Sequence, residues 1–257
     1  MTAVFLVFLT LFGLAVGSFL NVVIVRMPAD ESILHPPSKC PQCENEIALR
    51  DNVPVLSWLL LHGKCRSCGE PIPIGYPLVE LGNAVLWLAA GLYFGPHAVL
   101  LPYLFLFSVL LAQSVIDLEL YVLLDAITKP AILISIVALT AVAFTLDNPK
   151  GAILGALIGM VGYFVFLLLP NIVYSKGMGF GDVKLAALLG LYLGYIHPFL
   201  ILFSLIIACL VGIAVGGVLY FARGRKSSQF AFGPWLALGC VITILLSHQI
   251  LKPYGLG

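Results

Sequence analysis

The sequence predicts an all-α, polytopic membrane protein with about eight transmembrane helices. Hydrophobic residues make up 61% of the 257 residues and charged residues 10%, whereas charged residues form about a quarter of a typical soluble domain. Apolar runs close to 20 residues long, the length that crosses a bilayer as a helix, recur along the chain. Short segments containing Gly, Pro or Asn separate these runs. The composition therefore excludes a soluble globular protein.

The apolar runs give the predicted helices in chain order. We expect membrane spans at about residues 2–25, 77–95, 98–116, 122–145, 151–173, 183–197, 199–221 and 231–250. The first run is interpreted as a retained span, because no basic segment precedes it and no small-residue cleavage site closes it. In the fifth run, Gly151, Gly155 and Gly159 recur every four residues, a pattern that permits close helix approach in lipid.

The lysines and arginines predict the orientation. If odd-numbered spans exit to the cytoplasm, the cytoplasmic side holds 11 of the 13 Lys and Arg residues: Arg26, Lys39, Arg50, Lys64, Arg66, Lys129, Lys176, Lys184, Arg223, Arg225 and Lys226. Lys150 and Lys252 are the other two. The positive-inside rule then places both termini outside and the polar segment 26–76 in the cytoplasm.

Residues 26–76 form the one sizeable polar segment, and they carry two cysteine pairs. These are Cys40-Pro-Gln-Cys43 and Cys65-Arg-Ser-Cys68, with 21 residues between them. A segment of about 50 residues needs a staple to fold. Two CxxC turns can supply four thiolates to one tetrahedral ion, most often zinc, and folding would then depend on the metal. A redox-active or disulfide pair is the alternative, which a cytoplasmic location disfavours.

Two aspartates stand at the edges of apolar runs. Asp117 closes the third span, and Asp182 precedes the sixth in the stretch Gly177-Met-Gly-Phe-Gly-Asp-Val-Lys184. Ionisable groups at membrane depth are costly, which makes them candidate functional residues. On the predicted orientation both lie at the cytoplasmic ends of their spans. The glycines break the helix and leave the backbone open to a substrate strand; a plain loop in which Asp182 caps the next helix is the alternative.

Asp125 follows Asp117 by eight residues. The two would lie roughly 12 Å apart along a continuous helix, so they cannot pair with each other while the helix persists. We expect Asp125 to cap the fourth span or to be a polar partner of it. Glu119 is interpreted as a solvated residue.

Two carboxylates that meet in a partly desolvated site share a proton. One can accept a proton from a water that attacks a peptide carbonyl, while the other polarises that carbonyl and protonates the leaving amine. Asp117 and Asp182 therefore predict a membrane aspartyl protease. A proton-coupled transporter is the alternative, although it predicts inverted repeats that are not evident here. A membrane thiol oxidoreductase that uses the CxxC pairs is a third hypothesis.

An ordered set of motifs resembles the bacterial type IV prepilin peptidases, bifunctional GxGD-type aspartyl proteases that also act as N-methyltransferases. The set spans nearly the whole chain: Gly17-Ser-Phe-Leu-Asn-Val-Val-Ile-Val-Arg-Met-Pro28, the two cysteine pairs, Asp51-Asn-Val-Pro-Val-Leu-Ser-Trp-Leu59, Tyr76-Pro-Leu-Val-Glu80, Ile116-Asp117 with Asp125, and Gly179-Phe-Gly-Asp-Val-Lys184. The chain departs from the family at Leu124, where proline is usual, which softens the expected helix break.

The resemblance implies that Asp117 and Asp182 are catalytic. It also implies that the catalytic loop is supported by Gly179, Gly181, Asp125 and Lys184. The substrate would be a prepilin or pseudopilin, of a type IV pilus, a type II secretion system or a competence apparatus. Its short basic leader would be cut after glycine on the cytoplasmic side.

The resemblance further implies that the new N-terminal residue is methylated from S-adenosylmethionine. The candidates for this step are Gly17, Asn21, Arg26 and Glu80, and the alternative is that they anchor the metal loop to the helices. No GxGxxG motif marks a Rossmann-type cofactor site.

These expectations give a domain division and a location. Residues 1–25 are a first transmembrane helix, 26–76 a cytoplasmic metal-binding loop associated with methyl transfer, and 77–257 a bundle that carries the protease site. The expected partners are a prepilin or pseudopilin helix and the lipid bilayer, with no nucleic acid. The location is the bacterial inner membrane, with the active site facing the cytoplasm.

Overall fold

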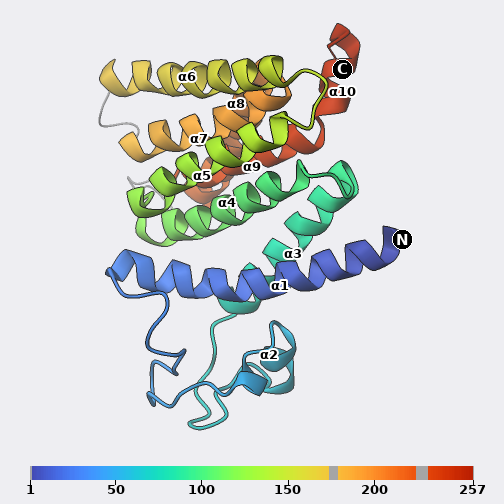
Figure 1. The fold of residues 1–257 in the computed structure, drawn as a ribbon. Coiled ribbons are helices and arrows are strands. Elements are labelled where there is room, and N and C mark those ends of the chain that lie inside the picture. The colour runs from blue at the N-terminus through green and yellow to red at the C-terminus, as the bar shows by residue number, and fades with distance from the viewer. Residues whose placement is uncertain (1, 174–178, 224–230, 257) are drawn as a thin grey trace. The chain divides into compact units, whose positions relative to one another are not determined.

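The computed structural model describes residues 2–173, 179–223 and 231–256, drawn as a ribbon in Figure 1. Helices dominate these ranges, and extended pairing within them is limited to two isolated bridges, Lys39–Glu46 and Lys64–Pro71. The all-α prediction is therefore confirmed. The chain divides into two compact units, Met1–Leu100 and Leu101–Gly257.

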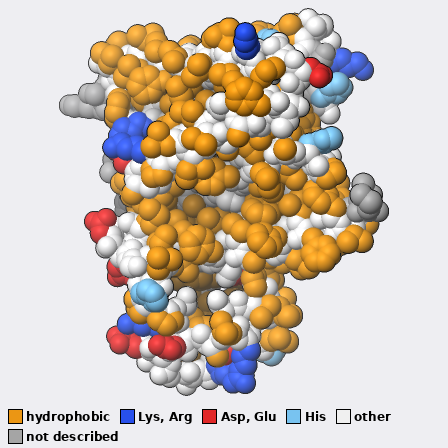
Figure 2. Space-filling model, viewed as in Figure 1, with side chains coloured by type: hydrophobic (Ala, Val, Ile, Leu, Met, Phe, Trp, Pro, Cys, Tyr) orange, Lys and Arg blue, Asp and Glu red, His pale blue; other side chains and the backbone are white. Residues whose placement is uncertain are grey.

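Six helices in the described ranges are long and apolar enough to cross a membrane. They are α1 (Thr2–Arg26), α3 (Gly75–Phe94), α4 (Leu100–Leu120), α5 (Asp125–Ala143), α6 (Pro149–Val173) and α8 (Leu200–Arg223). A bent pair follows, in which α9 (Gly233–Leu245) turns by 71° into α10 (Ser247–Leu251) and the turn η3 (Lys252–Tyr254). A further long helix, α7 (Phe180–Ile196), has 17 residues. The predicted count of eight is thus approximate, and the protein is a multi-pass membrane protein, with hydrophobic side chains over most of the face in Figure 2.

In the first unit, α1 packs against α3 through glycines. A Cβ on Gly13 would lie 3.0 Å from the Cα of Ala84, and one on Gly17 would lie 2.7 Å from the Cα of Glu80. The Asn83 side-chain amide donates a hydrogen bond to the carbonyl of Gly13 (2.8 Å). Between the two helices the chain forms the polar loop, which contains the short turns η1 (Met27–Ala29), η2 (Leu49–Asp51) and α2 (Leu56–Leu60).

In the second unit, α7 is the central helix. Nearly all its residues from Asp182 to Tyr195 are buried, as expected of a helix that is apolar on every side. Gly155 and Gly159 of α6 meet Gly190 and Gly194 of α7 so closely that a Cβ at any of the four would strike the facing backbone. Gly155 and Gly159 of the predicted small-residue pattern thus allow close helix approach, whereas a Cβ on Gly151 would meet the Asn148 side chain instead.

Two boundaries differ from the predicted spans and shape the candidate site. The fourth span was predicted from residue 122, but α5 begins at Asp125, because Tyr121 takes a left-handed conformation (φ 57°) and ends α4. The sixth span was predicted from residue 183, but α7 begins at Phe180. Asp182 therefore lies inside the first turn of a helix.

Candidate active site and metal centre

Asp117 lies three residues before the end of α4 and is 5% exposed. Its Oδ2 accepts a hydrogen bond of 3.0 Å from the backbone N–H of Gly233, the first residue of α9. The carboxylate thus joins two helices that are more than 100 residues apart in the sequence. Sequence reasoning did not predict this partner.

Asp182 lies in the first turn of α7 and is 7% exposed. Its backbone N–H donates to the carbonyl of Gly179 (3.1 Å), the residue that precedes the helix. A Cβ on Gly179 would meet Asp182 Oδ2 only at 3.7 Å, an ordinary contact. Gly177, the first glycine of the predicted stretch, lies outside the described residues, as do Lys176, Arg225 and Lys226 of the orientation prediction.

Leu123 contacts the glycines that neighbour each of the two aspartates. This residue belongs to the non-helical link 121–124 between α4 and α5. A Cβ on Gly181, next to Asp182, would lie 3.0 Å from Leu123, and a Cβ on Gly233, which contacts Asp117, would lie 3.1 Å from it. Asp117 is also close enough to Asp182 to act on it electrostatically. The structure therefore brings the two predicted carboxylates into one buried region.

Gln113 holds the link in place from one helical turn before Asp117. Its side-chain amide donates to the Leu124 carbonyl (3.0 Å) and to Thr128 Oγ1 (2.6 Å), while its Oε1 accepts the Leu124 N–H (3.1 Å). Gln113 is 1% exposed. A lone amide in an apolar span, on the same helix face as Asp117, is the sequence signal that could have identified it.

Asp125, Lys184 and Lys129 form an ion cluster at the start of α5 and α7. Lys184 Nζ lies 2.7 Å from both carboxylate oxygens of Asp125, and Lys129 Nζ lies 2.8 Å from Oδ2. Lys184 Nζ also stands 5.0 Å from the centroid of the Phe180 ring. Asp125 is therefore a polar partner of α5, as predicted, and makes no side-chain cap. The structure therefore brings Asp125 into contact with Lys184. Lys184 follows Asp182 by two residues, so the ion cluster lies close to Asp182 along the chain.

The four loop cysteines form one cluster. Their sulfur atoms all lie within 4.8 Å of one another, and Cys40 Sγ lies 3.8 Å from Cys68 Sγ. Both knuckles have the same backbone bonds, from the Cys40 N–H to the Asn45 carbonyl and from the Cys65 N–H to the Glu70 carbonyl. Since thiolates so placed are metal ligands, the cluster indicates a structural metal site.

An ion pair braces the loop beside the cysteines. Arg66 donates to Asp51 through Nε (2.8 Å to Oδ2) and Nη2 (2.7 Å to Oδ1). The hydrogen bonds from the Arg66 guanidinium hold the pKa of Asp51 below its ordinary value. Asp51 is therefore ionised at neutral pH and links η2 to the second knuckle.

The methyl-transfer candidates are placed by their backbone contacts. Gly17 of α1 lies against Glu80 of α3. One helical turn further along, the side-chain amide of Asn21 in α1 donates to the Tyr76 carbonyl of α3 (3.1 Å). The Glu80 carboxylate accepts the N–H of Val55 at 2.7 Å, where the loop enters α2. Arg26 instead donates to the Ser32 and Pro37 carbonyls. Three of the four residues are thus brought together where α1, α3 and the loop meet.

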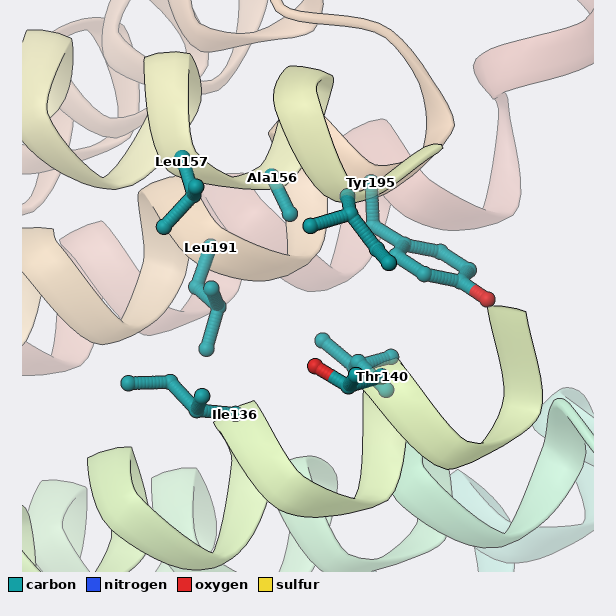
Figure 3. A pocket seen from close by; sticks show the side chains of 8 residues that line it. Ile136, Thr140, Ala156, Leu157, Leu191 and Tyr195 are labelled. Carbon is teal, nitrogen blue, oxygen red and sulfur yellow. The ribbon is translucent and has the colours of Figure 1, made fainter. Parts of the chain in front are cut away.

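A small cavity between α5, α6 and α7 lies apart from the aspartates (Figure 3). Its volume is about 20 Å³, room for about one water molecule, and its lining is aliphatic apart from Thr140 and Tyr195. Leu191 in its wall stands nine residues beyond Asp182, roughly 13 Å along the helix. This cavity therefore contributes nothing to the candidate active site.

A multi-pass helical bundle with two buried aspartates and a separate four-cysteine loop is the combination expected of a membrane aspartyl protease. The comparisons with known proteins agree. Residues 104–217 match the type IV leader peptidase family, and residues 11–94 match the bacterial peptidase A24 N-terminal domain.

The curated relatives carry the same resemblance over most of the chain. The prepilin leader peptidase/N-methyltransferase of Aeromonas hydrophila is 36% identical, over 95% of this chain and 91% of the relative. The enzyme of the same name from Pseudomonas putida is 36% identical, over 96% of this chain and 93% of the relative. That of Myxococcus xanthus is 40% identical, over 88% of this chain and 66% of the relative. No solved structure matches. The chain therefore belongs to the type IV leader peptidase family, and the transporter alternative finds no support.

Proposed function

We propose that this chain is a membrane aspartyl endopeptidase and N-methyltransferase for prepilins or pseudopilins. It removes a short basic leader after glycine, on the cytoplasmic side of the substrate's hydrophobic helix, and methylates the new N-terminal residue. The observation that supports the protease most directly is that Asp117 of α4 and Asp182 of α7 are both buried, while Gly233, which bonds Asp117, and Gly181, which precedes Asp182, both lie against Leu123.

The proposed chemistry needs nothing beyond these two side chains and water. One carboxylate accepts the proton of the attacking water, and the other, in its protonated form, polarises the scissile carbonyl through a hydrogen bond and then transfers that same proton to the leaving amine. Burial of both carboxylates excludes bulk water, which strengthens each electrostatic interaction in the site. Asp125 and Lys184 support the start of α7, and Gly181 lets Leu123 approach it.

The first test is cleavage of a prepilin peptide that has a basic leader, a glycine at the cut and an apolar helix after it. We expect Asp117→Asn and Asp182→Asn each to lower cleavage below detection while the purified protein stays folded and keeps its metal. Asp147→Asn, an exposed carboxylate between α5 and α6, is the matched control and should cut normally. Cleavage by both site variants would show that the protease assignment is wrong.

For methyl transfer we propose the division predicted from the sequence: residues 1–25 as the first helix, 26–76 as the associated loop and 77–257 as the protease bundle. S-adenosylmethionine would be the methyl donor. The candidate residues support an anchoring role, because the Glu80 carboxylate already accepts the Val55 N–H. They hold the loop against α1 and α3 and thereby position it for the reaction.

Glu80 separates anchoring from chemistry. Glu80→Gln keeps an oxygen acceptor for the Val55 N–H, although a neutral acceptor bonds about half as strongly as a carboxylate. Glu80→Ala removes the acceptor. We expect Glu80→Gln to lower methylation of a mature-length peptide by severalfold and Glu80→Ala to abolish it, with cleavage retained in both. If Glu80→Gln were as inactive as Glu80→Ala, the charge itself would be required.

The metal in the loop is proposed to be zinc. Tetrahedral zinc–thiolate bonds of about 2.3 Å place sulfurs about 3.8 Å apart, and Cys40 Sγ and Cys68 Sγ lie 3.8 Å apart. Cys40, Cys43, Cys65 and Cys68 would hold it as thiolates in a structural role. The proposed location is the bacterial inner membrane, with both termini outside and the active site facing the cytoplasm.

A further inference from the structure

We propose that Gly233 is a positioning residue of the protease site, and that its backbone N–H fixes the orientation of the Asp117 carboxylate. The inference rests on the proposed function, because it concerns how the carboxylate pair is prepared for attack on the peptide. The sequence shows Gly233-Pro234 only as the opening of the last apolar run.

The donor of this hydrogen bond, the Gly233 N–H, has no acceptor within its own helix. Gly233 is the first residue of α9, and first-turn N–H groups have no acceptor within their own helix. This N–H lies 3.0 Å from Asp117 Oδ2, in a buried position. Bonding one carboxylate oxygen fixes the plane of the group, so that Oδ1 is the oxygen presented to water and substrate.

Any residue except proline would supply an N–H, but the space requires glycine. A Cβ at position 233 would lie 2.7 Å from Asp117 Oδ2 and 3.1 Å from the Leu123 Cδ2 atom. The backbone of Gly233 is outside the left-handed region, so alanine meets no conformational penalty there. The effect of a side chain is therefore steric, and it falls on the carboxylate and on Leu123.

Leu123 transmits this arrangement to the second aspartate. The same side chain that stands beside Gly233 also stands beside Gly181, which precedes Asp182. α9, the 121–124 link and α7 thus meet around one leucine, and the glycines on both sides set how closely they approach. Catalytic groups must be held within about 0.5 Å of their working geometry, which this contact provides for the pair.

The test compares three glycine-to-alanine variants of the full-length protein on the prepilin peptide. Gly233→Ala should lower kcat by about 100-fold, the cost of roughly 1 Å of misplacement, with KM and Tm close to wild type. Gly239→Ala is the structural comparison, since its Cβ would strike the Ser204 carbonyl without contacting Asp117, and it should lower Tm with little change in kcat. Gly217→Ala, with open space around it, should change neither.

A spectroscopic readout makes the inference independent of cleavage. In protein labelled with ¹³C-aspartate, the infrared difference between wild type and Asp117→Asn identifies the carboxyl band of Asp117. The same difference taken in the Gly233→Ala background should show that band shifted, because the hydrogen bond is displaced.

The outcomes separate the two proposals. A kcat within about twofold of wild type, an unmoved infrared band, or a loss of Tm like that of Gly239→Ala would overturn the role of Gly233. If wild type itself does not cleave, the proposed protease function fails, and the infrared band still decides whether Gly233 orients Asp117.

Discussion

The cysteine cluster and the aspartate pair are assembled at different ranges along the chain. Each cysteine knuckle closes on itself through backbone bonds within about six residues, as from Cys40 to Asn45 and from Cys65 to Glu70. The aspartate site instead needs α4, the 121–124 link, α7 and the start of α9 to meet. The first site can form as soon as its loop binds an ion, whereas the second exists only in the packed bundle.

This difference predicts how each site fails. A local metal site loses its folded structure when its ion is removed, but the unfolding stays within the loop. A site assembled from distant segments is sensitive to changes at buried residues such as Gln113, which hold one of those segments in place.

Removal of the metal should unfold the loop and leave the aspartate bundle intact. Structural zinc contributes on the order of 10–16 kcal/mol in small zinc-binding peptides, more than a loop of this size gains from its core. After chelation, or in the double variant Cys65→Ala/Cys68→Ala, we expect amide hydrogen exchange to become fast throughout residues 38–72. Exchange in α7 should be unchanged.

The matched control for metal removal is Cys209→Ala, a single exposed cysteine in α8. It should behave as wild type in metal content and in exchange. Fast exchange in α4 and α7 after metal loss would contradict the separation of the two sites, and a loop that stayed protected would contradict the structural role of the metal.

The contrast also explains how far the sequence predicted the molecule. The apolar runs gave the helices to within a few residues, as at α6, predicted at 151–173 and observed as Pro149–Val173. The cysteine knuckles were evident because their spacing is itself the site. Asp117 and Asp182 were evident because charge is rare in apolar spans.

The parts of the site that were not predicted depend on tertiary contacts. Tyr121-Val-Leu-Leu124 has no glycine or proline, so the sequence favoured a helix from residue 122. The helix ends there because Tyr121 turns left-handed and Gln113 satisfies the Leu124 backbone. Leu123 and Gly233 matter only because α7 and α9 arrive beside the link, which no local pattern encodes. Proximity in the fold, and not residue type, makes them part of the site.

Gln113→Leu tests this distributed assembly with an intermediate effect. The change leaves the buried Leu124 N–H without its partner, which costs about 1–3 kcal/mol, whereas the Leu124 carbonyl keeps the N–H groups of Ile127 and Thr128. We expect Tm to fall by several degrees, at about 2–4 °C per kcal/mol, and cleavage to fall by about tenfold or more as the link moves. Methylation of a mature-length peptide should be unchanged.

The control for Gln113→Leu is Thr140→Val, which replaces a polar side chain of α5 in the small cavity, away from the link. Its kcat should equal that of wild type. If Gln113→Leu lowered Tm but left kcat intact, the clamp on Leu124 would stabilise the bundle without setting the geometry of the aspartates.

The smallest expected effect belongs to the ion pair of the loop. Because Arg66 lowers the pKa of Asp51, the pair stabilises the loop wherever Asp51 is ionised. The contribution is complete above the unfolded aspartate pKa of about 3.9, and it is lost only as the pH falls through the lower folded pKa. Asp51→Asn should therefore reduce the temperature of metal release slightly, and by the same amount at pH 6 and at pH 8.

Metal release followed with a chromogenic chelator measures this difference, with Glu46→Gln, an exposed carboxylate of the same loop, as the control. Both pH values lie far above the titration of Asp51, so a difference that vanished at pH 6 would mean that another group carries the effect. Addition of salt should reduce the difference, since the pair is partly exposed. Binding of the metal by the cysteines should be insensitive to salt. The salt-dependent part of the difference in release temperature therefore measures the Asp51–Arg66 ion pair, and the remainder of the loop's stability comes from the metal.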